Sequence, residues 1–93
     1  MIIGVLTVEA HLSDAHSLKD KRRVIKSLTD RIRAKFNVSI AQVGALDTWQ
    51  STELGLAMVS NDQALIHKVF TTIVDYIEAK GELVITDYRM QMF

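Results

Sequence analysis

The sequence predicts a single α+β domain over residues 1–93, with strands and helices following one another along the chain. Segments in which every second residue is apolar are typical of strands that bury one face, and they occur near both ends and in the middle. Between them lie two segments with apolar residues at helical spacing. The chain has no proline and no low-complexity tract, so no interdomain linker is expected.

The first strand and the first helix are expected between residues 2 and 36. One side of the strand should face the core, and it carries Ile2, Gly4, Leu6, Val8, Ala10 and Leu12. Ser17 has the position of an N-cap, and Asp20 follows three residues later as an acidic variant of the capping box. The helix over residues 17–35 has its apolar residues at Leu18, Ile25, Leu28, Ile32 and Phe36.

A hairpin is expected next. Val38–Ala45 and Thr52–Ser60 both read as strands, and residues 46–51 form the connection between them. Leu54, Leu56 and Met58 share one face of the second strand.

The second helix is expected to begin after Asn61 as its cap, with Asp62 in its first turn, and to end at Gly81. Its predicted buried stripe consists of Leu65, Ile66, Val69, Phe70, Ile73 and Ile77. Glu82–Met92 is the last predicted strand. The resulting order, βαββαβ, is that of the ferredoxin-like fold, a four-stranded antiparallel sheet with both helices on one face.

The second face of such a sheet has no helix to cover it. Strand parity places apolar residues on that face, namely Ile3, Val5, Ala57 and Val59. Because these residues should be contiguous across neighbouring strands, we expect a homodimer packed sheet to sheet or edge to edge. Scattered surface hydrophobic residues, which are normal, are the alternative.

Charge is distributed unevenly along a chain whose net charge is zero. Residues 17–35 contain eight cations and two carboxylates, a net +6, and the rest of the chain therefore carries −6. A helical projection places five cations on one solvent-facing stripe: Lys19, Arg22, Arg23, Lys26 and Arg33. Lys21 projects toward the buried side, so it should keep its amine at the core edge, pair with a carboxylate or serve a site.

Several of these cations crowd the N-terminal end of the helix, where the macrodipole is already positive. A bound phosphate or other anion would relieve this conflict, using backbone N–H groups and the long side chains around them. The alternative is that nearby carboxylates offset the field and the stripe is only solvated. If the partner is RNA, we expect phosphate contacts with structured RNA, because the central strands offer no aromatic residue for base stacking.

No catalytic or metal-binding pattern is found. His11, His16 and His67 match no known metal-ligand spacing, and the phosphate-loop, nucleophile-elbow and zinc-protease motifs are absent. We therefore expect no enzyme, no metal and no cofactor. His16 could orient the loop before the helix or donate to an anion when protonated. Trp49, the only tryptophan, is either a recognition aromatic or folds over an edge of the core.

Three motifs resemble the YlxP-like family of small bacterial proteins of unknown function: the run from His16 to Leu28, the group Asp47-x-Trp49-Gln50, and the run from Leu54 to Asp62. The resemblance implies a ferredoxin-like fold that is often dimeric. It also implies genes placed among those for translation factors, including ribosome-binding factor A. The positions that match the motifs are His16, Ser17, Lys19, Asp20, Lys21, Arg22, Lys26, Trp49, Gln50, Ser60 and Asn61.

These observations favour a non-enzymatic, cytoplasmic protein that binds RNA or the ribosome through its basic first helix. The expected nucleic-acid or anion contacts are Lys19, Lys21, Arg22, Arg23, Lys26 and Arg33, with His16, Trp49 and Gln50 as accessory residues. The alternative is a protein–protein interaction module, or a dimer that senses a small anion, without nucleic-acid binding. No membrane partner is expected, because no segment is long and apolar enough to span a bilayer.

Overall fold

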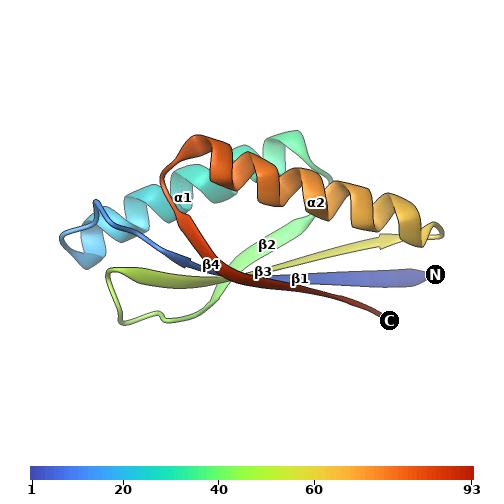
Figure 1. Cartoon of the computed structure of the whole chain (residues 1–93), viewed down its shortest axis with the longest axis horizontal. Coiled ribbons are helices and arrows are strands. Elements are labelled where there is room, and N and C mark those ends of the chain that lie inside the picture. Colours follow the sequence, from blue (N-terminus) through green and yellow to red (C-terminus); the bar gives the residue numbers. More distant parts are fainter.

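The computed structural model describes residues 1–93 and places four strands in one antiparallel sheet with two helices against one face (Figure 1). The elements are β1 (Ile2–His11), α1 (Leu18–Lys35), β2 (Ser39–Gly44), β3 (Ser51–Ser60), α2 (Gln63–Lys80) and β4 (Val84–Met92). Across the sheet the strand order is β2-β3-β1-β4, so β3 and β1 are central and β2 and β4 are edges. The predicted ferredoxin-like α+β fold is confirmed.

The centre of the core is formed by β1 and β3. Leu6 pairs with Leu56 and Val8 with Leu54 in the antiparallel register, and all four side chains are buried. The helices cover them with Ile25, Leu28 and Ile32 from α1 and with Ile66, Phe70, Ile73, Val74 and Ile77 from α2. The predicted core-facing side of β1 is therefore confirmed.

Gly4 marks a close approach between β1 and α2. A β-carbon at this position would overlap the Ile66 side chain and lie 3.0 Å from a ring carbon of Phe70. The absence of a side chain at Gly4 lets α2 pack directly on the central strand.

Ser17 caps α1 as predicted. Its Oγ accepts a hydrogen bond of 3.1 Å from the N–H of Asp20. The Asp20 carboxylate in turn accepts a hydrogen bond of 3.2 Å from the N–H of His16. The return bond of the capping box thus goes to the residue before the cap, which fixes the entry of the chain into the helix.

The prediction that Asn61 caps α2 is wrong by one residue. The cap is Asp62, whose Oδ1 accepts hydrogen bonds from the N–H groups of Ala64 and Leu65 at 3.0 and 3.3 Å. Both Asn and Asp are good caps, and the strand before them runs to Ser60, which leaves Asn61 in the connection. The helix ends at Gly81, as predicted, with a left-handed φ of 72°.

Leu65 is the second error in α2. Its side chain is 45% exposed, whereas Val74, which was not in the predicted stripe, is buried. One residue corresponds to about 100° around a helix, so Leu65 turns away from the core face centred on Ile66, Phe70 and Ile77.

The strand ends differ from the prediction by one or two residues. β2 begins at Ser39 and not at Val38, and β4 begins at Val84 and not at Glu82. β2 ends before Ala45, which has a positive φ of 56° and turns the chain into the loop of residues 45–50.

Candidate nucleic-acid interface

The residues of the first two sequence motifs meet at the end of the molecule opposite the marked termini (Figure 1). Here the connection between β1 and α1 lies against the loop 45–50. The N–H of Leu12 donates to the carbonyl of Gln50 at 2.8 Å, and the rings of His16 and Trp49 lie 6.5 Å apart. Segments that are distant in the sequence therefore form one surface around the start of α1.

The buried side chain of Lys21 links α1 to the loop 45–50 by hydrogen bonds. Lys21 is only 2% exposed, and its Nζ donates hydrogen bonds to the carbonyls of Ala45 and Thr48. Burial lowers the pKa of the Lys21 amine, and the charge of Asp47 opposes part of that shift. Lys21 was predicted to be one of the anion-binding cations, but in this conformation its amine is turned inward and occupied by two backbone carbonyls.

Three cations remain free of such partners. Lys19, Arg22 and Arg23 are exposed, and none forms an ion pair or a side-chain hydrogen bond. All three lie in the first two turns of α1, and we refer to them as the N-terminal cations. Here the helix dipole and the first backbone N–H groups add to their positive potential.

Lys26 and Arg33, the other two members of the predicted stripe, share one carboxylate. Lys26 Nζ lies 2.8 Å from Asp30, and Arg33 lies 3.4 Å from it. The hydrogen bond from Lys26 lowers the pKa of the Asp30 carboxyl, and the positive charges of Lys26 and Arg33 lower it further. Arg33 also donates to the carbonyl of Ile40 at 2.8 Å, on the edge strand β2. The stripe thus divides into an unpaired N-terminal part and a paired C-terminal part.

The role of Asp30 was missed in the sequence, although the signal was present. Asp30 follows Lys26 by four residues and precedes Arg33 by three, the two spacings at which helical side chains are neighbours. The two remaining cations of α1 also have partners: Arg31 pairs with Glu82, and Lys35 lies over the ring of Tyr76.

Trp49 lies on the surface beside His16. Trp49 is 38% exposed, so part of its side chain is available to a partner. The two rings are tilted by 49°. Gln50 has an exposed side chain and contributes its carbonyl to the contact with Leu12.

The uncovered sheet face carries two neighbouring apolar rows, as predicted. In one row Ile3 pairs with Val59 and exchanges backbone hydrogen bonds with Phe93, and in the next Val5 pairs with Ala57. Val59 and Phe93 are 60% and 69% exposed. We refer to these five residues as the apolar rows.

The opposite end of the same face is charged. Glu9 lies between Glu53 on β3 and Asp87 on β4 in the register of the sheet. Arg89 lies 3.9 Å from Glu53 and partly offsets this acidic row. The apolar and acidic residues of the face are therefore separated along the strands.

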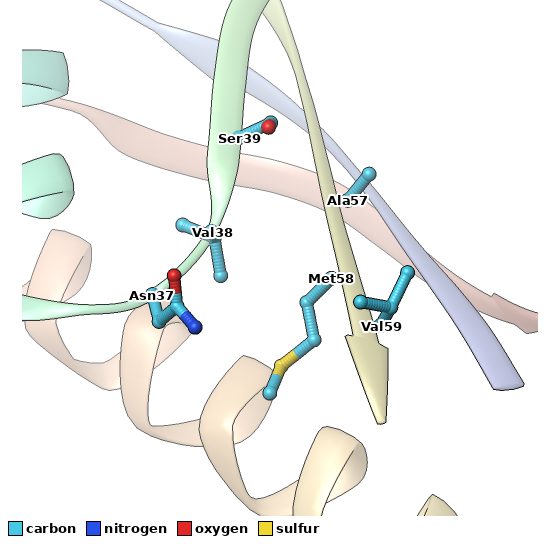
Figure 2. A pocket seen from close by; sticks show the side chains of 6 residues that line it. All are labelled: Asn37, Val38, Ser39, Ala57, Met58 and Val59. Carbon is cyan, nitrogen blue, oxygen red and sulfur yellow. The ribbon is translucent and has the colours of Figure 1, made fainter. Parts of the chain in front are cut away.

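A hollow of about 250 Å³ lies where the β2–β3 ladder ends (Figure 2). Its lining residues are Asn37, Val38, Ser39, Ala57, Met58 and Val59. Figure 2 shows Ala57 and Val59 on one side of β3 and Met58 reaching toward the helix layer on the other. Because none of the lining side chains is titratable, this hollow offers no acid–base chemistry.

The structure contains no group of three or more histidine or acidic side chains arranged to hold a metal ion. Neither α1 nor α2 is apolar enough over its length to cross a membrane.

The family model described as "Protein of unknown function (DUF503)" matches residues 3–90 of the chain. The chain belongs to this family. It is 38% identical over 92 residues to "Uncharacterized protein YlxP" of Bacillus subtilis (strain 168), covering 99% of this chain and 100% of that protein. The predicted membership of a YlxP-like family is confirmed, and neither description assigns the family a function.

Two solved structures share the fold of this family member. The de novo designed protein Foldit4 has a TM-score of 0.57 at 13% identity, with 100% of this chain and 97% of that chain covered. The putative chlorite dismutase TA0507 has a TM-score of 0.53 at 14% identity, with 99% of this chain and 44% of that chain covered. At such identities the likeness concerns the fold alone.

Proposed function

We propose that this protein is a non-enzymatic, RNA- or ribosome-associated binding protein that contacts phosphates through the N-terminal cations. The observation that carries the proposal is that Lys19, Arg22 and Arg23 stay exposed and unpaired while every other cation of α1 has a partner. Three unpaired charges beside free helix N–H groups form a local positive site on a chain of zero net charge. The proposal includes a cytoplasmic location, which the lack of cysteine favours.

The contact is expected to involve phosphates, with no base reading on the sheet. Sheets that bind single-stranded RNA stack bases on aromatic residues of their central strands. The open face of β1 and β3 instead presents aliphatic and small residues in its apolar rows and carboxylates at its other end. Carboxylates on that face would repel an RNA backbone, so the basic helix is the better surface for RNA.

A salt titration tests this proposal. Affinity for a structured RNA hairpin and for ribosomal subunits is measured over a range of salt concentrations. Each phosphate contact contributes about −0.7 to −0.9 to the log–log slope, so three contacts predict a slope of about −2 to −3. A slope near −4 would indicate five phosphate contacts, with Lys26 and Arg33 breaking their ion pairs with Asp30 and binding phosphates as well. A flat slope would contradict the proposal.

We also propose that two copies of the chain associate through the apolar rows. In this dimer the two open sheet faces pack against each other, and the two-fold axis lies between the sheets, perpendicular to the strands and level with the apolar rows. The apolar rows of both copies then meet, and the acidic rows lie at opposite ends of the dimer. This arrangement avoids the repulsion that two facing acidic rows would produce, and it buries side chains as exposed as Val59 and Phe93. The two basic helices then lie on the outer sides of the dimer, because they cover the opposite faces of the sheets.

Val59→Glu is expected to convert this dimer into a monomer in analytical ultracentrifugation, because it places a charge within the apolar contact. Val84→Glu is the matched control, since Val84 is 56% exposed and pairs with His11 at the far end of β1. A wild-type chain that sediments as a monomer at about 100 μM would refute the proposed dimer, as would a Val59→Glu variant that remains dimeric.

A further inference from the structure

The loop 45–50 holds Trp49 in a defined position. Lys21 donates to the carbonyl of Thr48, the residue before Trp49, and Leu12 donates to the carbonyl of Gln50, the residue after it. The loop is closed further by the bond from the N–H of Thr48 to the carbonyl of Ala45 at 3.3 Å. A large aromatic side chain is thus held near the surface by backbone contacts on both of its sides.

This position lies near the start of the helix that carries the N-terminal cations. His16, whose ring is 6.5 Å from that of Trp49, directly precedes the helix cap Ser17. Along a helix with a rise of 1.5 Å per residue, Lys19 lies about 3 Å and Arg22 about 7.5 Å beyond this cap. Around the helix, Arg22 is about 100° from Lys21, whose amine contacts the loop, whereas Lys19 and Arg23 are each about 160° from it. Arg22 is therefore the N-terminal cation that projects nearest to the loop side, and all three lie within the axial length of a few nucleotides.

We propose that Trp49 stacks on an unpaired nucleobase of the RNA whose phosphates contact the N-terminal cations. This inference rests on the proposed function and specifies its ligand as RNA with an extruded base, in a bulge or a loop, next to a paired stem. Aromatic rings accept any base, because every base has a π-face, so the site selects an unpaired nucleotide without selecting its identity. His16 lies where it can cover the edge of the stacked base.

The chemistry of the surface favours this ligand over an apolar peptide. An isolated aromatic ring beside unpaired lysine and arginine side chains matches a planar base attached to a phosphate backbone. The residues on either side of Trp49, Thr48 and Gln50, are polar and exposed, and Asp47 adds a carboxylate. Leu46, which is 61% exposed, is the other large apolar side chain of the loop. The positive charge that borders it supplies the complementarity to RNA.

Trp49 is the only tryptophan, so its fluorescence reports directly on stacking. Two RNA hairpins serve as probes, with the same stem and the same compact tetraloop in which the loop bases stack on one another. One has a fully paired stem, and the other has a single bulged nucleotide in its stem. The bulged hairpin is expected to quench Trp49 fluorescence and to bind about 5- to 150-fold more tightly, the range that one aromatic–base stack provides. The paired hairpin is expected to bind through phosphates with little quenching.

Trp49→Ala is expected to remove the preference for the bulged hairpin over the paired one, as measured by anisotropy of labelled RNA. Trp49→Phe keeps an aromatic face and should retain part of the preference for the bulged hairpin. This variant tests the stacking site even if Trp49→Ala does not fold stably. Equal, salt-dependent binding of both hairpins without quenching would overturn the stacking site and leave the proposed function standing. Salt-independent binding, or no binding of either hairpin, would overturn both.

Discussion

Replacing Lys21 with alanine is expected to lower the free energy of unfolding by about 2–4 kcal/mol. The side chain is buried, so its removal leaves a cavity beside the core, and the carbonyls of Ala45 and Thr48 lose their donor. Lysine is rarely buried without such partners, and here both partners belong to the loop that carries Trp49. Urea denaturation followed by circular dichroism measures the loss.

Lys21→Met separates packing from hydrogen bonding. Methionine keeps most of the unbranched chain but cannot donate, and the hydrogen bonds to the two carbonyls are only partly buried. We therefore expect Lys21→Met to cost only about 1 kcal/mol. Amide hydrogen exchange of Thr48, whose N–H donates to the carbonyl of Ala45 within the loop, should accelerate in both variants, because both release the loop. If Lys21→Ala were as stable as the wild type, or left exchange in the loop unchanged, Lys21 would not anchor it.

The fold follows from periodicity that is local in the sequence. Alternation in β1 identified the buried side of the strand, and Ser17 with Asp20 marked the start of α1, because the interactions involved span only a few residues. The errors in α2 are of the same local kind. Asn61 and Asp62 are adjacent capping residues, and the choice between them depends on where β3 ends.

The site could be predicted only in part, because its decisive contacts are between distant segments. A helical projection placed Lys21 on the buried side, but its acceptors are backbone carbonyls in a loop that has no motif for them. The position of Trp49 beside His16 depends on the β2–β3 hairpin folding back to the start of α1. Composition gave the number of charges on α1, but it could not show that Arg31 pairs with the distant Glu82 or that Lys35 lies over the ring of Tyr76.

Arg22 and Arg23 are expected to contribute more to RNA binding than any other pair of residues. Arg22→Glu with Arg23→Glu should lower the affinity for a structured RNA hairpin by about 100-fold or more at low salt, since two attractive contacts become repulsive. The log–log salt slope should become less steep by about 1.4 to 1.8, since each phosphate that the variant no longer binds removes about 0.7 to 0.9. Fluorescence anisotropy of labelled RNA across a salt series measures both quantities.

The double variant should bind less tightly while folding at least as well. Arg22 and Arg23 lie in the second turn of α1, where the effect of the helix dipole has already weakened. Glutamate at these two positions is therefore expected to raise stability only slightly, by about 0.3 kcal/mol per residue at most. A loss of affinity that accompanies a higher melting temperature cannot result from unfolding. It would mean that wild-type α1 sacrifices some stability to keep these positions positive.

Lys68→Glu with Lys80→Glu is the matched control, because it changes the net charge by the same amount on the neighbouring helix α2. Lys68 forms no ion pair, and Lys80 only lies over the ring of Tyr76. If binding depends on a local site on α1, this control should retain most of the RNA affinity and the full salt slope. If both double variants lose affinity equally, the protein responds to RNA only through its overall charge, and the N-terminal cations are a solvated helix face.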